Sequence, residues 1–148
     1  MNTDQTIQEL LRGLGLPARG PGADGRYPLV FDDELALSLT PGGGGALIEG
    51  EVAVLPTDPD VRERLLRGLL AHGAAAMAQG AEVVHLDGHG VTVLLSRRLV
   101  REECSLASLR QALSEFVSAL EHWRGVAAPE RAPGAGGRGP LTLTGVTR

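Results

Sequence analysis

The chain has 148 residues, the length of one compact domain, and carries a formal net charge of −4. Only 3% of its residues are aromatic, and its 14 basic residues are all arginines spread along an acidic chain. A nucleic-acid binder needs a basic face and usually aromatic rings for stacking, so this composition excludes that class. The single cysteine, Cys104, excludes an intrachain disulfide framework and a cysteine-rich metal site.

No apolar run approaches the ~18–20 residues of a membrane span. The first residues, Met-Asn-Thr-Asp-Gln, lack the basic start and apolar core of a signal peptide. The sequence therefore predicts a cytoplasmic protein with an aliphatic core and no membrane partner.

The first predicted element is a short helix over residues 4–14. Its apolar residues repeat at helical spacing and share one face: they are Ile7, Leu10, Leu11 and Leu14. Gly15 and Pro17 end the helix, and a loop rich in glycine and proline follows over residues 18–26.

Three strands are predicted next, over residues 27–31, 35–40 and 46–55. The second strand alternates strictly, which places Leu35, Leu37 and Leu39 on one face, and the third has one wet face. The four glycines at 42–45 lie between two strands, and the chain contains no lysine. This run is therefore a hairpin turn and not a phosphate-binding loop.

A central helix is predicted over residues 59–79, with Asp58 as its cap. Its apolar residues cover an arc of about 180° at 100° per residue, wider than one sheet-facing stripe needs. We therefore expect the helix to be buried on two sides, against its own sheet and against a second copy of the chain. The expected dimer interface consists of Val61, Leu65, Leu66, Leu69, Leu70 and Met77.

A predicted hairpin joins strands over residues 82–86 and 91–95, and a last helix begins near Ser105 with a single buried face that includes Trp123. The element order predicts an α+β fold with a largely antiparallel twisted sheet and three helices. The expected domain covers residues 1–125. Residues 126–148 are expected to be a flexible tail rich in glycine and proline, in which residues 141–144 form a strand or nothing.

Few residues offer chemistry. His85 and His89 straddle a predicted turn with Asp87 between them, without a nucleophile motif or a metal-ligand set. Cys104 follows two glutamates, which raise rather than lower a thiol pKa. A chain this short without a convergent polar set favours a binding module over an enzyme. We expect no catalytic residue, cofactor or metal; the alternative is a small enzyme that uses Asp87, His85 and His89.

Several segments in this order resemble one family. They are residues 7–16, residues 28–39, the Val-Ala-Val-Leu-Pro of 52–56, the leucine pairs at 65–66 and 69–70, residues 80–87 and 90–99, and the helix that ends at Trp123. Over residues 3–124 the chain resembles the class I chaperones of bacterial type III secretion, the CesT/Tir chaperone family. The resemblance implies a homodimer through the central helix, with a five-stranded sheet and three helices in each subunit.

The resemblance also implies a function in the bacterial cytoplasm. Such a chaperone binds the N-terminal segment of a cognate secreted effector in extended form and keeps it secretion-competent without ATP. The alternative is a regulatory module of the same fold that sequesters another regulator of the secretion system.

An extended segment can add to an exposed sheet edge while its apolar side chains enter surface grooves. We expect these grooves on the first helix and the first three strands, at leucines and a phenylalanine that the domain covers only partly. The expected effector-binding residues are Leu10, Leu14, Leu29, Phe31, Leu37 and Leu39, with Arg12, Arg97 and Arg98 available to pair with acidic groups of the partner.

Overall fold

A computed structural model describes residues 2–17, 20–76, 78 and 80–128 of the chain. Its elements follow the predicted order, and the α+β prediction is confirmed. The elements are α1 (Thr3–Gly13), β1 (Tyr27–Phe31), β2 (Leu35–Gly42), β3 (Gly45–Val54), α2 (Pro59–Ala76), β4 (Val83–Leu86), β5 (Thr92–Leu99), the short 3-10 helix η1 (Arg101–Glu103) and α3 (Leu106–Ala127).

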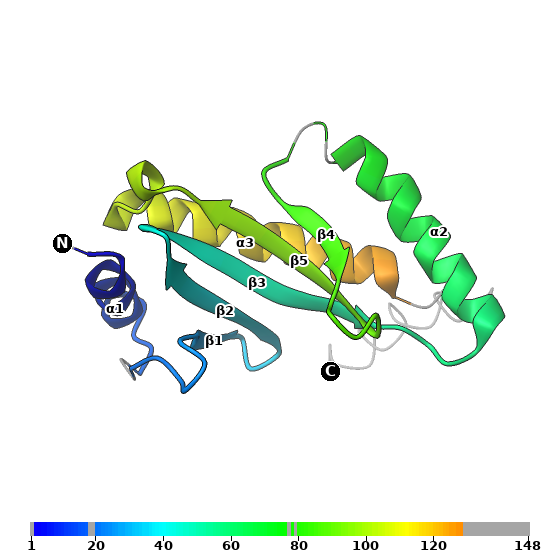
Figure 1. The fold of residues 1–148 in the computed structure, drawn as a ribbon, viewed down its shortest axis with the longest axis horizontal. Coiled ribbons are helices and arrows are strands. Elements are labelled where there is room, and N and C mark those ends of the chain that lie inside the picture. Colours follow the sequence, from blue (N-terminus) through cyan, green and yellow to red (C-terminus); the bar gives the residue numbers. More distant parts are fainter. Residues whose placement is uncertain (1, 18–19, 77, 79, 129–148) are drawn as a thin grey trace, which may run out of the picture.

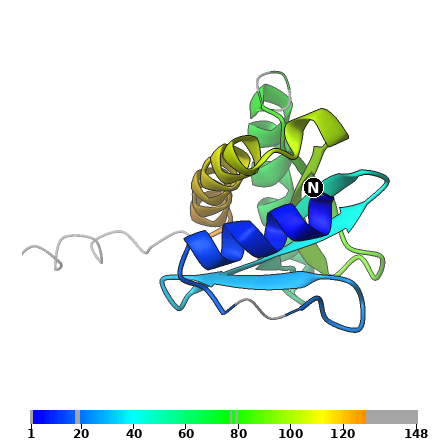
Figure 2. The same cartoon turned by 90° about the vertical axis from the view of Figure 1, so that its left-hand side faces the viewer.

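The five strands form one antiparallel sheet in the order β1-β2-β3-β5-β4 (Figure 1). Strands β1 and β4 are therefore its two edges. Helices α1 and α3 lie on the same face of the sheet (Figure 2). Alternate strand residues face these helices, as the leucine alternation in β2 predicts.

Local sequence explains where α1 begins and how two of the strands turn. The Asn2 side chain accepts a hydrogen bond from the backbone of Gln5, whose own side chain accepts one from the backbone N–H of Asn2, a capping box that starts α1. Between β2 and β3, Gly43 and Gly44 have φ of 62° and 83°. Two consecutive residues with positive φ make the tight turn that matches the twist of a hairpin, and glycine adopts this conformation without strain.

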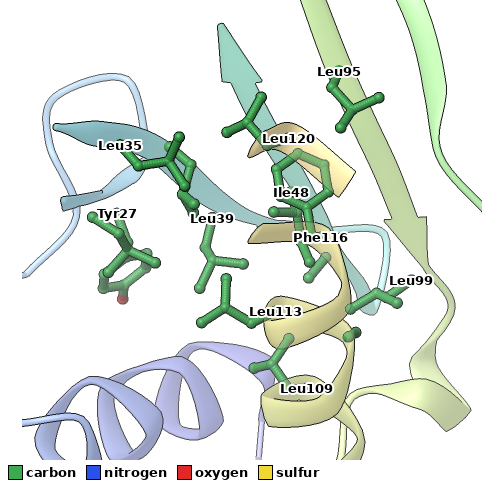
Figure 3. Close-up of a cluster of buried hydrophobic side chains, with 14 of the residues drawn as sticks. Tyr27, Leu35, Leu39, Ile48, Leu95, Leu99, Leu109, Leu113, Phe116 and Leu120 are labelled. Atoms are coloured by element: carbon green, nitrogen blue, oxygen red, sulfur yellow. The ribbon is translucent and has the colours of Figure 1, made fainter. Parts of the chain in front are cut away.

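The core lies between the sheet and α3. Phe116 and Leu120 of α3 pack with Ile48 of β3 and Leu95 of β5 (Figure 3). Gly50 of β3 makes room for this helix, because a Cβ atom there would lie 2.5 Å from Leu120 Cδ2. The mainly aliphatic core predicted from composition is confirmed.

The contacts of α2 differ from the prediction. We expected this helix to pack on its own sheet, but it packs chiefly against α3. Only Leu69 and Gly73 of its residues are buried. The periodicity identifies which residues are apolar but carries no information about which element covers them.

The C-terminal part of the chain is described only to residue 128. Helix α3 continues to Ala127, two residues beyond the predicted domain boundary. The predicted tail beyond residue 128, including the possible strand at 141–144, lies outside the described residues, as does Met77.

Candidate protein-binding surfaces

Four of the predicted effector-binding residues are buried in the core. The prediction that the domain covers them only partly is wrong for Leu10, Leu29, Leu37 and Leu39. The reason is that α1 and α3 lie over the sheet face to which the odd-numbered residues of β1 and β2 point, so these side chains fill the interior. They have no side-chain surface to offer a partner in this structure.

Apolar surface does remain at the end of α1 and along β1. Leu14 is 37% exposed, Val30 is 49% exposed and Phe31 is half-buried. We call these three residues the β1 surface. Leu14 and Phe31 lie on the helix-covered side of the sheet, and Val30 points to the other side because neighbouring strand residues alternate. Arg12 is exposed on α1, and its pairing with a partner stays a prediction.

The outer edge of β1 has unpaired backbone groups. A proline within a strand is tolerated where its missing N–H would face away from the neighbouring strand, so the backbone of Pro28 faces outward. Because the hydrogen-bonding direction repeats every second residue, the backbone N–H and C=O of Val30 also face outward. The carbonyl of the next residue, Phe31, faces inward and accepts a hydrogen bond from the backbone N–H of Glu34. Among the described residues, no backbone hydrogen bond outside the sheet reaches Pro28 or Val30. The edge therefore offers one donor, Val30 N–H, and the carbonyls of both residues.

Two side chains of α1 hold β1 in place. The Tyr27 hydroxyl donates to Asp4 Oδ1 at 3.1 Å and accepts from Gln8 Nε2 at 3.4 Å. The tyrosine ring is buried, so these contacts fix the first residue of the edge strand beneath the helix. A partner would thus meet a prepositioned edge.

A second apolar surface lies on α2. Around the helix, the buried Leu69 and Gly73 form a central stripe, with Val61 on one side of it and Leu66 and Leu70 on the other. Leu70 is 72% exposed, and its neighbour along the helix surface, Leu66, is half-buried. An 18-residue helix that buries two residues gains little from its own domain, which fits a helix that packs against a second chain.

The β4 edge of the sheet is also open. The backbone N–H of Asp87 donates to the carbonyl of Thr92, so Asp87 and every second residue before it face the neighbouring strand β5. The backbone groups of Val84 and Leu86, which lie between these residues, therefore face outward. Val83 and Leu86 have exposed side chains. This edge has no proline, and it carries N–H donors and carbonyl acceptors together.

Arg97 is paired within the domain. Its guanidinium contacts Glu115 of α3 at 2.7 Å and Glu82, just before β4, at 3.4 Å, and the arginine side chain is only 14% exposed. Two hydrogen bonds hold the pKa of the Glu115 carboxyl below its ordinary value; the bond from Arg97 has the larger effect and the bond from Gln111 the smaller. Two carboxylates of the same domain therefore already pair with Arg97, and its pairing with a partner stays a prediction. Arg98 is exposed on the opposite face.

Within the described part of the chain, no hydrogen bond joins Asp87, His85 and His89, the residues of the alternative enzyme hypothesis. The Asp87 carboxylate accepts hydrogen bonds from the backbone of Thr92 and Val91, which hold its pKa below the ordinary value and organise the β4–β5 turn. His85 Nε2 lies 2.6 Å from Ser96 Oγ.

Ser96 was not identified from the sequence, since it carries no motif and meets His85 only through strand pairing. Its hydroxyl lies 3.3 Å from Glu49 Oε2. In a catalytic triad the carboxylate orients the histidine, whereas here it contacts the serine and the other imidazole nitrogen faces the carbonyl of Leu86. The arrangement ties β3, β5 and β4 together.

Two further observations bear on chemistry. Burial, then Glu103 and Glu102, raises the pKa of the Cys104 thiol, which donates to the carbonyl of Val100. The raised pKa makes this thiol a weak nucleophile. Within the described part of the chain, no group of three or more histidine, cysteine, aspartate or glutamate residues is arranged to hold a metal ion, and no helix is long and apolar enough to cross a membrane.

The fold and its surfaces define a small α+β protein whose distinguishing features are open sheet edges and exposed apolar residues, the features of a protein-binding module. The chain belongs to the Tir chaperone protein (CesT) family, whose model matches residues 5–124. The resemblance noted in the sequence is thereby confirmed. No curated protein sequence is significantly similar to the chain.

Solved structures share the fold. SchA–HopA1, described as a chaperone–effector complex, matches with a TM-score of 0.62 and 17% identity over 82% of this chain and 91% of that chain. ExoU–SpcU, a heterodimeric complex of the type III secretion system of Pseudomonas aeruginosa, matches with a TM-score of 0.62 and 17% identity over 84% of this chain and 99% of that chain. The Yersinia pestis type III secretion chaperone SycH, in complex with a fragment of YscM2, matches with a TM-score of 0.56 and 16% identity over 82% of this chain and 99% of that chain. The expected sheet of five strands with three α-helices is confirmed.

Proposed function

We propose that this chain is an export chaperone of a type III secretion system that binds the N-terminal segment of a secreted effector in extended form. Membership of the Tir chaperone family carries the proposal. A related fold is found in a chaperone–effector complex. The proposed action is binding alone, in the bacterial cytoplasm, and therefore needs neither ATP nor a cofactor.

The β1 surface supplies a physical route for this binding. An extended client can pair with Val30 N–H and the outward carbonyls of β1, which provides affinity that is independent of sequence. Successive client side chains would then alternate between Phe31 and Leu14 on one side and Val30 on the other. Such a client contributes apolar residues at every second position, and Arg12 favours an acidic residue near the end of α1.

We further propose that two copies associate through α2. Leu70 is the most exposed apolar residue of this helix and has the half-buried Leu66 beside it, whereas Val61 and the half-buried Leu65 lie on the other flank of the buried stripe. Burying a leucine stabilises an interface by about 2 kcal/mol, and a twofold axis buries each residue twice. Leu69 faces α3 and contributes to the interface by fixing the helix in place.

The experiment tests client binding through the β1 surface. The tagged chain is expressed in its native host, and co-purified proteins are identified, together with secretion assays in a deletion strain. We expect capture of the N-terminal part of a secreted protein whose export falls in the deletion strain. The double variant Leu14→Asp with Val30→Asp should lose that capture, whereas Val100→Asp, an equally exposed valine beyond β5, should retain it.

Two results would contradict the proposal. Capture of a folded regulator, with secretion unchanged in the deletion strain, would support the regulatory module instead. Equal capture by the double variant and by Val100→Asp would show that the client binds elsewhere on the domain.

A further inference from the structure

The outer edge of β1 is closed at its N-terminal end by bonds within the preceding loop. Arg26 is the next residue before Pro28 whose backbone would face outward, since the hydrogen-bonding direction repeats every second residue. The Arg26 N–H donates to Asp24 Oδ1 at 3.1 Å, and the Arg26 carbonyl accepts from the backbone N–H of Gly22 at 2.9 Å. Both groups are already bonded, so an added strand begins its pairing at Pro28.

The same edge ends at the turn into β2. Asp32 and Asp33 have φ of 53° and 58°, two consecutive left-handed residues that turn the chain back in a tight hairpin. The backbone therefore leaves the extended direction directly after β1. Between its two ends the edge directs three groups outward, which are the carbonyls of Pro28 and Val30 and the N–H of Val30. An added strand makes at most three backbone hydrogen bonds here, so the fit of each one matters.

These three groups determine which amides of an added strand are used. Every strand pair of this sheet is antiparallel, and antiparallel pairing is the more stable kind, so we expect the added strand to run antiparallel to β1. Its residue opposite Val30 then exchanges two hydrogen bonds with Val30, and its residue opposite Pro28 donates one to the proline carbonyl. The N–H of the residue between them, opposite Leu29, faces away from β1.

We infer that the β1 edge selects its clients by the position of their backbone amides. The client residues opposite Val30 and Pro28 both need an N–H, so neither is a proline, whereas the residue opposite Leu29 can be proline without loss of a hydrogen bond. Directly opposed residues share a face of the sheet, so this middle side chain lies on the side of Phe31 and Leu14 and is apolar. As a statement about secreted clients, the inference rests on the proposed function.

Pro28 also limits how tightly any strand binds. The carbonyl of the client residue opposite Pro28 faces the position of the missing N–H and receives no hydrogen bond from β1. The variant Pro28→Val supplies that donor and keeps a residue that suits a strand. Because Pro28 is exposed, the substitution removes no packing from the core.

Synthetic peptides test the inference without any secreted protein. The probe is a short peptide that alternates leucine and threonine; with its leucines on the side of Phe31 and Leu14, its threonines lie opposite Val30 and Pro28. Two matched derivatives carry N-methyl groups either on every leucine or on every threonine, which removes the N–H groups from one side of the strand at a time. Fluorescence anisotropy of the labelled peptides measures the Kd, and hydrogen exchange of the Val30 amide in the full chain locates the binding.

The two derivatives should behave differently. We expect methylated leucines to change the Kd by less than about threefold and methylated threonines to weaken binding at least about thirtyfold, because two hydrogen bonds are lost. With the unmethylated peptide at about ten times its Kd, the Val30 amide should exchange about tenfold more slowly, since only about a tenth of the chain is then free. Pro28→Val should bind the same peptide about three- to tenfold more tightly.

Three results would overturn the inference. Loss of binding on methylation of the leucines in place of the threonines would contradict the antiparallel pairing, and Val30 exchange that no peptide slows would contradict pairing at this edge. Equal affinity of the wild type and Pro28→Val would show that the proline does not limit the number of hydrogen bonds. None of these measurements involves capture of a secreted protein, so the proposed function and the inference fail separately.

Discussion

Gly73 of α2 lies against the indole of Trp123 of α3, where a Cβ atom at position 73 would be 3.8 Å from Trp123 Cη2. The small residue lets the two helices approach, and the tryptophan is itself buried. This contact fixes which side of α2 faces the domain and therefore which side is left for another chain. Leu70, one turn from Leu66 on the flank of the stripe, is left exposed.

Replacing Leu70 tests the proposed dimer. Leu70→Asp should weaken self-association at least about a hundredfold, because the carboxylate is desolvated twice in a symmetric interface. Light scattering across a concentration series measures this, with Ala71→Asp, which lies opposite the buried stripe of Leu69 and Gly73, as the control. A wild-type chain that remains monomeric well above micromolar concentration would contradict the dimer.

Two glycines of the β2–β3 hairpin should respond differently to the same substitution. At Gly45 an added Cβ would overlap the carbonyl of Leu99, a backbone group that cannot move aside, whereas Gly42 faces open space. Gly45→Ala should lower the free energy of unfolding by about 2–3 kcal/mol, and Gly42→Ala by less than about 0.5 kcal/mol. Thermal melts of both variants measure the difference; similar melting temperatures would mean that the hairpin relaxes freely.

The ion cluster of Arg97 should stabilise the β4 side of the sheet. Arg97→Met leaves Glu82 largely buried without its partner, which we expect to cost about 1–3 kcal/mol of unfolding free energy. Arg98→Met, the exposed neighbour, is the control and should change little. Urea unfolding compares the two; equal midpoints would show that the arginine is dispensable.

Stability should also fall in acid. Glu115 and Asp87 have pKa values lowered in the folded state, by the Arg97 hydrogen bond and by backbone amides respectively. A lowered folded-state pKa contributes stability above the unfolded-state value and loses it as pH falls through the folded value. We expect the contribution to be constant from neutral pH to about 5 and to decline below about 4.

Variants separate the two carboxyl groups in that acid range. Arg97→Met removes the hydrogen bond that contributes most to the lowered pKa of Glu115, so the melting temperature of this variant should depend less on pH below about 5 than that of the wild type. Asp87→Asn removes the second group altogether. A wild-type melting temperature that does not fall between pH 5 and 3 would contradict both assignments.

Much of the fold follows from periodicity, because period 2 and period 3.6 patterns locate the elements, and glycines and prolines mark most of the turns. The pattern does not show which helix or strand packs over a given apolar face. Leu37 and Leu39 lie on one strand face as predicted, yet that face is the interior. Val30 of β1 is exposed on the other side of the sheet, and the leucine pattern does not point to it. The burial of Arg97 likewise depends on Glu115, which only the packing of α3 brings near.

Pro28 has one more consequence, which concerns how the molecule avoids itself. Two β1 edges brought together would meet carbonyl to carbonyl at the proline, with one donor available from each chain. Such a pair is poorly bonded, so like edges resist sticking to one another in a crowded cell. A foreign strand with all its amides intact meets only one such gap, the missing N–H of Pro28 itself. The proline ring therefore disfavours pairing between two like edges more than pairing with a strand that has no proline.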